Sequence, residues 1–142
     1  FFLLFKGLLP DTKDARVKLF LIYKMLGLRK DKEMLFKQGS YMPLEALGPY
    51  KNHIIAFARN YKGEWLITAA GRFFTGMVKE GQLPLGEGVW ADTHIVLPEG
   101  LPSLWKDAIS GQEISGEGKL FVKDIFLHFP AAALLNSSKE KG

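Results

Sequence analysis

The amino-acid sequence predicts a mainly β protein, an antiparallel Greek-key β-sandwich preceded by one or two helices. One continuous segment near the start, from Ala15 to about Lys30, has helical character. After Gly39 the chain changes to short apolar runs rich in Ile, Val, Phe and Trp, separated by turn residues. This pattern is typical of an antiparallel sandwich or barrel. The 142 residues make one ordinary domain, which is large enough to bury a core.

The predicted helix is apolar on nearly every side. A loop over 8–14 precedes it, and Thr12 or Asp14 can serve as its N-cap. A helix that covers one sheet needs a single apolar stripe, so a helix that is apolar nearly all round is buried on more than one side. We therefore expect part of it to pack against a partner outside the chain. The candidates for this interdomain packing are Leu19, Phe20, Ile22 and Tyr23.

The apolar runs after Gly39 define the expected strands. They cover 41–47, 53–59, 65–69, 94–97, 105–109, 112–115, 119–126 and 129–135. Two hairpins are predicted, one around the turn at 60–63 and one around Ser110-Gly111. Consecutive apolar residues in 53–59 predict burial on both faces of that strand. Residues 72–78 are ambiguous, and 81–88 contain three glycines and are expected to form a loop.

Composition excludes several classes of function. The chain has no cysteine, which rules out a disulfide framework and thiolate metal sites. Its net charge of +4 is scattered, whereas nucleic-acid binding needs basic side chains concentrated on one face. The apolar start, Phe1 to Phe5, is far shorter than the ~20 residues of a transmembrane helix. We therefore expect neither nucleic acid nor a membrane as a partner. The apolar start also leads us to expect that the chain is cut from a longer protein.

No pattern of residues predicts a catalytic or metal site. The histidines His53, His94 and His128 each lack a second histidine or a carboxylate at metal-ligand spacing. Asp11 and Asp14 flank a helix start, where carboxylates are expected as caps. No serine lies in a Gly-x-Ser-x-Gly elbow. The expectation is therefore a chain without catalytic residues, metal or cofactor.

The three tryptophans divide into two groups. Trp65 and Trp105 lie inside predicted strands, where aromatic side chains dominate the packing of a small sandwich. Trp90 follows a glycine-rich loop, which favours an exposed or interdomain position. An exposed aromatic face can stack on a sugar ring.

A broader pattern runs from the helix to the first hairpin. It consists of 22–30, Leu35, Phe36, Gly39, Tyr41 and Leu44, followed by 53–59. This pattern resembles the end of the enzymes of the α-amylase clan. There the last barrel helix carries a Leu-x-x-Leu-Arg pattern and leads into a C-terminal sandwich, so the resemblance implies a sandwich of the α-amylase C-terminal-domain type.

A narrower pattern extends from Asp14 to Leu135. Its segments are Asp14-Ala15-Arg16-Val17-Lys18, Leu83-Pro84-Leu85-Gly86, Val89-Trp90-Ala91-Asp92-Thr93, Leu97-Pro98, Trp105-Lys106-Asp107 with Ser110-Gly111, and 129–135. In order and spacing these segments resemble maltooligosyltrehalose synthase. Two positions depart from that family: Ala15 replaces a glycine, and Gly71-Arg72 stands where Pro-Arg is expected.

This resemblance implies a cytoplasmic enzyme of trehalose biosynthesis. The parent converts the reducing-end α-1,4 linkage of a maltooligosaccharide to α,α-1,1 by intramolecular transglucosylation, with its carboxylates in a (β/α)₈ barrel. That catalytic barrel is the expected partner and lies N-terminal to Phe1, so the chain alone is expected to be inactive. The implied domains are a helical segment over 1–34, a sandwich over 35–136 and a polar tail over 137–142.

Two alternatives stay open. In the first alternative, the sandwich is a glucan-binding accessory module, and Trp90 and Arg72 are the candidates for carbohydrate contact. Otherwise the chain is a freestanding interaction domain that dimerises through the helix around Phe20.

Overall fold

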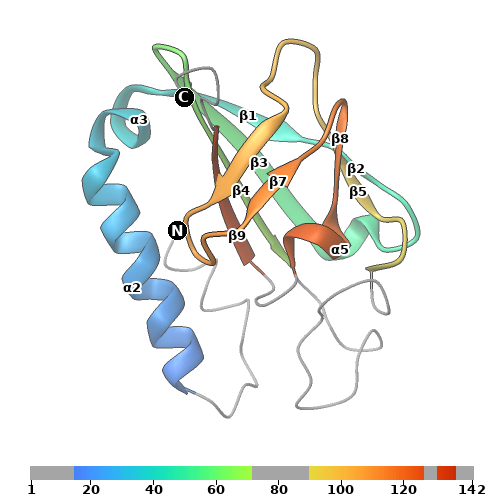
Figure 1. Cartoon of the computed structure of the whole chain (residues 1–142), viewed down its shortest axis with the longest axis horizontal. Coiled ribbons are helices and arrows are strands. Elements are labelled where there is room, and N and C mark those ends of the chain that lie inside the picture. The colour runs from blue at the N-terminus through green and yellow to red at the C-terminus, as the bar shows by residue number, and fades with distance from the viewer. Residues whose placement is uncertain (1–14, 72–89, 127–130, 137–142) are drawn as a thin grey trace.

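The computed structural model describes residues 15–71, 90–126 and 131–136 (Figure 1). Helix α2, Ala15–Asp31, covers the predicted helical segment, and α3, Glu33–Gln38, follows it directly. Two sheets form the rest of the described fold. Its strands are β1 Ser40–Leu44, β2 Ala46–Leu47, β3 Ile54–Tyr61, β4 Glu64–Gly71, β5 His94–Val96, β6 Leu104–Asp107, β7 Glu113–Ser115, β8 Lys119–Phe121 and β9 Ala131–Asn136. Two short helical turns, η1 Lys51–His53 and α5 Val122–Ile125, complete it.

The mainly antiparallel sandwich is confirmed. One sheet has six strands in the order β1-β3-β4-β9-β6-β7, and the other has three in the order β2-β5-β8. All strand pairs described in the two sheets are antiparallel. In the larger sheet the last strand, β9, lies between β4 and β6, so the two predicted hairpins are joined by a strand distant from both in the sequence.

The hairpin of β3 and β4 has a two-residue turn. Tyr61 pairs with Glu64, and both residues between them have positive φ, 50° at Lys62 and 85° at Gly63. This combination defines a type I′ turn, whose twist matches that of the flanking strands. The turn sets the register of eight residue pairs between the two strands.

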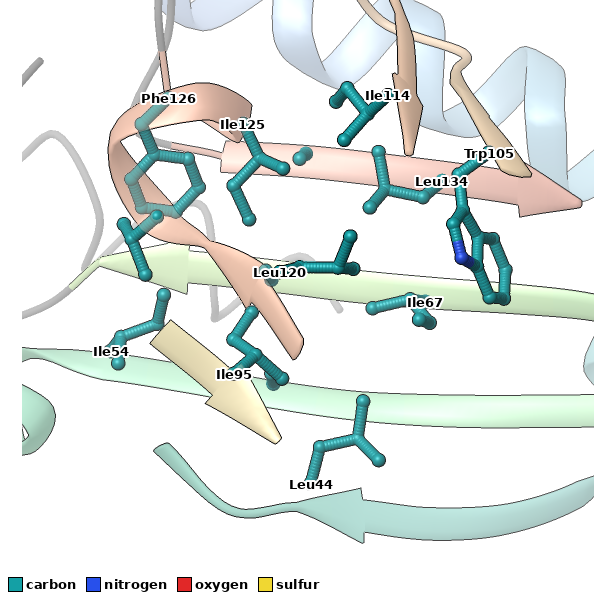
Figure 2. Close-up of a cluster of buried hydrophobic side chains, with 14 of the residues drawn as sticks. Leu44, Ile54, Ile67, Ile95, Trp105, Ile114, Leu120, Ile125, Phe126 and Leu134 are labelled. Atoms are coloured by element: carbon teal, nitrogen blue, oxygen red, sulfur yellow. The ribbon is translucent and has the colours of Figure 1, made fainter. Parts of the chain in front are cut away.

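The six-stranded sheet has a hydrophobic cluster on each face. On one face the sheet packs against the three-stranded sheet and α5, and the buried side chains between them form the first cluster. Figure 2 shows side chains from these elements pointing toward one another. On the other face Met25 and Leu28 of α2 and Leu35 of α3 pack against the sheet and form the second cluster with it. Successive side chains of the central strands therefore point alternately to the two clusters. In β4, Ile67 belongs to the first cluster and Leu66 to the second. The described fold thus has three layers, helices, large sheet and small sheet.

Burial on both faces belongs to β4 rather than to β3. The expectation for 53–59 is wrong, because β3 alternates between buried and half-buried side chains. In contrast, 66–71 of β4 and 131–134 of β9 are buried without interruption. These two strands lie at the centre of the large sheet, where the helices and the small sheet cover opposite faces.

Two predicted strands change character inside the fold. The segment 41–47 divides at Glu45 into β1 and β2, which belong to different sheets, and the Glu45 carbonyl already accepts a hydrogen bond from the Val96 N–H at 2.8 Å. The segment 119–126 is a strand only to Phe121. It then forms α5, which places Val122, Ile125 and Phe126 together in the first cluster at helical spacing.

The predicted boundary after residue 34 lies inside α3. Leu35 of this helix shares the second cluster with Met25 and Leu28 of α2. The two helices are therefore bound to the sheet by one apolar layer. The division into 1–34, 35–136 and 137–142 stays a prediction.

Candidate functional site

Asp107 is the one fully buried carboxylate of the described residues. Its Oδ1 accepts hydrogen bonds from the backbone N–H groups of Ile109 at 3.0 Å and Ala133 at 3.2 Å. Its Oδ2 accepts one from the Ser110 hydroxyl at 3.0 Å. Burial raises the pKa of Asp107, and these donors oppose that rise. The carboxylate closes the β6–β7 turn and holds it against β9, which is a structural task.

Two other acidic side chains form ion pairs with lysines. Glu33 pairs with Lys37 one helical turn later at 2.9 Å, and this lysine lowers the pKa of Glu33. Glu64 of β4 pairs with Lys32 between α2 and α3. In the parts of the chain that the structure describes, no three His, Asp or Glu side chains gather as metal ligands would.

The described histidines lie against aromatic rings. Nδ1 of His94 is 3.0 Å from the Asp92 carbonyl oxygen, and its ring meets the edge of Phe121. The His53 ring lies 6.0 Å from that of Tyr50. His128 lies outside the described residues.

Trp90 is fully buried, so the expectation that it is exposed is wrong. Its relative exposure is 0%, and its ring meets Phe126 edge-on with 5.5 Å between centroids. Tyr50 makes a similar edge contact from another side. The preceding glycines indicate a loop, but the indole itself fills the first cluster because α5 brings Phe126 against it. Carbohydrate contact at Trp90 was predicted because the indole was expected to be exposed, and the buried indole removes that reason. The other candidate, Arg72, lies outside the described residues.

The other two tryptophans serve the core as expected. Trp105 is buried, and its Nε1 donates to the Pro102 carbonyl at 3.0 Å. Trp65 is half-buried and packs against the first cluster.

The outer side of the helices carries exposed apolar side chains. Tyr23 is 74% exposed, and Leu26 and Met34 are also exposed. An open groove beside them has Leu26 and Phe36 as its apolar lining and Arg29, Lys30, Glu33 and Lys37 as its charged lining. Of the four interdomain candidates, Tyr23 faces outward, whereas Ile22 packs against the second cluster. The side chains of Leu19 and Phe20 lie outside the description.

An aromatic cluster lies at the β1 edge of the large sheet. Tyr41 of β1 is 58% exposed, and its ring centroid is 5.2 Å from that of Phe57 on β3, with 38° between the ring planes. The Arg59 guanidinium lies over the Tyr41 ring at 5.6 Å and over the Phe36 ring at 5.4 Å. We call Tyr41, Phe57 and Arg59 the Tyr41 platform.

Sequence reasoning did not identify the Tyr41 platform. The signal available was the two-residue spacing of Phe57 and Arg59, which places both side chains on one face of a strand. The missing information was the register that sets Tyr41 opposite Arg59.

The helices of the described segments give no candidate for crossing a membrane, since none has the required combination of length and apolar character.

Comparison with known proteins gives one consistent result. No protein-family model matches the chain. Two putative maltooligosyl trehalose synthases, from two strains of Mycobacterium tuberculosis, are each 27% identical to it over 121 residues. The solved structure of a point mutant of maltooligosyltrehalose synthase from Arthrobacter ramosus superposes with a TM-score of 0.61 at 28% identity. The chain resembles the maltooligosyltrehalose synthases.

The similarity to maltooligosyltrehalose synthases covers most of this chain but only a small part of each enzyme. It covers 85% of the chain in each case, but 14% of the length of each relative. The chain therefore spans about one-seventh of the enzymes that it matches.

Several residues of the synthase-like motifs lie in the core of the described fold. Trp90, Trp105 and Asp107 are buried, and so is Thr93, whose hydroxyl accepts a hydrogen bond from the Tyr50 N–H at 3.1 Å. The described part of the closing motif, 131–135, lies in β9 at the centre of the large sheet. In the part of the chain that the structure describes, the buried residues among those that carry the resemblance thus belong to the core.

Proposed function

We propose that the chain is a C-terminal, non-catalytic domain of a maltooligosyltrehalose synthase. Such an enzyme would convert the reducing-end α-1,4 linkage of a maltooligosaccharide to α,α-1,1 by intramolecular transglucosylation, as part of trehalose biosynthesis in the cytoplasm. The observation that carries the proposal is the match of 85% of the chain to 14% of these enzymes, in both sequence and structure.

The arrangement of carboxylates supports a non-catalytic role. Retaining transglycosylation uses two carboxyl groups about 5–5.5 Å apart, free to act on a sugar. Asp107 is buried under three hydrogen-bond donors, and Glu33 and Glu64 are each paired with a lysine. These three carboxylates therefore have structural partners, and we assign the transferring carboxylates to the catalytic barrel of the longer polypeptide.

The exposed side of the helices supplies the contact with that barrel. Met25 and Leu28 hold α2 on the sheet, which leaves Tyr23 and Leu26 on the outside. Apolar side chains on an outer helix face are stabilised when a partner removes them from water. We assign the catalytic barrel of the same polypeptide as that partner.

The test starts from the size of the native polypeptide. Antibody raised against the chain should detect a protein several times larger than 15.9 kDa. The captured protein should convert maltohexaose to a non-reducing product, whereas the purified chain should leave the sugar unchanged. A native band at 15.9 kDa, or turnover by the purified chain, would overturn the proposal.

A further inference from the structure

We propose that a helix of the catalytic barrel crosses α2 closely at Gly27 and places carboxylates against Arg29 and Lys30. The identity of the partner rests on the proposed function, whereas the place and the chemistry of the contact rest on the outer side of α2. The inference adds two features to the apolar contact proposed above, a close approach of two backbones and a pairing of charges.

Gly27 lies in the interior of α2, where nothing in the described fold requires a glycine. The residue is exposed, and it is not among the glycines with positive φ. No atom of the described residues lies within 4 Å of the position that a Cβ would take. A glycine inside a helix is less stable than an alanine, and glycine is used where another backbone must come close. A neighbour at Gly27 that lies outside the described residues would explain this choice.

The exposed residues around Gly27 form one face of the helix. Residues three and four apart on a helix are neighbours. The face consists of Tyr23, Leu26, Gly27 and Lys30, all of which are exposed, whereas Met25 is buried on the sheet side. The missing side chain of Gly27 leaves a gap beside the larger apolar side chains, and helices pack by fitting the ridges of one into the grooves of the other. The face therefore suits a second helix.

The charges beside this face favour an acidic partner. The last turn of α2 carries Arg29 and Lys30, and neither forms an ion pair with a described residue. Both line the open groove next to Leu26. Glu33, the acidic residue that lines this groove, is already paired with Lys37. Carboxylates on an approaching helix would complement the two unpaired cations.

The catalytic barrel is a better partner for this face than a second copy of the chain. In a two-fold contact centred on Gly27, Lys30 of one copy would approach Lys24 of the other, and like charges repel. A barrel of the (β/α)₈ type, in contrast, carries its helices on the outside. The synthases match the chain over 14% of their length, so most of such a polypeptide lies outside the chain and can supply the helix.

Zero-length cross-linking of the native polypeptide tests the pairing of charges. A carbodiimide joins a lysine amine to a carboxylate that it touches, with formation of an amide and loss of one water. In the polypeptide captured by antibody, peptide mass spectrometry should show Lys30 joined to an Asp or Glu outside the 142 residues. Lys119 is the matched control and should give no such link. It is exposed on β8 of the small sheet, on the side of the molecule opposite α2 (Figure 1).

Gly27→Ala tests the close approach through effects of opposite sign in two polypeptides. In the 142-residue chain it should raise the equilibrium constant for folding about two- to fivefold, because alanine favours the helix and its Cβ has open space. In the longer polypeptide the same Cβ would push the two helices apart, so the midpoint of thermal unfolding should fall. Urea unfolding of the chain and thermal unfolding of the longer polypeptide measure the two effects.

Three results would overturn the inference: no link from Lys30 to the rest of the longer polypeptide, a link from Lys30 to a second copy, or stabilisation of both polypeptides by Gly27→Ala. None of them bears on the proposed function, which the size and activity of the native polypeptide decide. A native band at 15.9 kDa would overturn the proposed function and, with it, this choice of partner.

Discussion

The carboxylate of Asp107 and the backbone N–H of Ala133 join two strands that are far apart in the sequence. Their hydrogen bond of 3.2 Å links the end of β6 to β9. The Ala108 N–H donates in turn to the Ala133 carbonyl at 2.7 Å, so the same residue is held through both of its peptide groups. Asp107 thus fastens the β6–β7 hairpin to the centre of the large sheet.

Removal of this carboxylate should destabilise the chain. In Asp107→Ala, the N–H groups of Ile109 and Ala133 lose a buried acceptor, at a cost of about 2–4 kcal/mol in the free energy of unfolding. Asp107→Asn retains an acceptor oxygen and should cost less than half as much. Urea unfolding followed by circular dichroism measures both. A loss below about 0.5 kcal/mol for Asp107→Ala would show that the hydrogen bonds contribute little.

The same carboxylate should make stability depend on pH. Because burial raises the pKa of Asp107 in the folded chain, the folded state binds its proton more tightly than the unfolded state. Its contribution to stability is therefore greatest below the unfolded pKa, near 3.8, and falls as pH rises through the folded value. The stability of the unsubstituted chain relative to Asp107→Asn should thus decline from acidic toward neutral pH. A difference that is constant with pH, or that increases, would contradict the raised pKa.

Trp90 should act on stability through packing. Trp90→Ala removes a fully buried indole from contact with Phe126 and should cost about 3–5 kcal/mol. Trp90→Phe keeps an aromatic ring and should cost less. Thermal unfolding measures the loss, and quenching of tryptophan fluorescence by acrylamide in a chain with Trp65 and Trp105 replaced by Phe measures the accessibility of Trp90 directly. Efficient quenching in that folded variant would contradict the burial.

Neighbouring residues of α2 should differ sharply in their effect on the chain. Met25 and Leu28 are buried against the sheet, so Met25→Ala and Leu28→Ala should each cost about 2–5 kcal/mol. Tyr23→Ala and Leu26→Ala alter the outer side and should change the free energy of unfolding by less than about 0.5 kcal/mol. Urea unfolding of the four variants gives the comparison. Equal losses on the two sides would show that the outer face is already covered in the chain alone.

Local pattern was sufficient for much of the fold. The helix at 15–31 and the two hairpins were predicted because side-chain periodicity and turn residues act over a few neighbours. The same information failed at 122–126, where the spacing of Val122, Ile125 and Phe126 is helical but the flanking residues favour a strand. There the decisive contribution is burial of all three side chains in the first cluster.

The candidate surfaces depend on longer-range relationships. The apolar character of the helix predicted packing on a partner but not which residues it involves: Tyr23 is exposed, whereas Ile22 packs against the second cluster. Contact with a partner stays a prediction. Trp90 was placed wrongly because a glycine-rich loop indicates only where the backbone turns, whereas Phe126 and Tyr50 decide what surrounds the indole.

The sequence by itself determined the fold class, the hairpins, the apolar helix and the resemblance to maltooligosyltrehalose synthases. Only the tertiary structure decided that Glu45 divides one strand between two sheets, that β9 lies between β4 and β6, and that Tyr41 stands beside Phe57 and Arg59. A two-residue period shows which side chains share a face of a strand. It does not show which strand lies alongside, because that depends on the combined burial of residues distant in the chain.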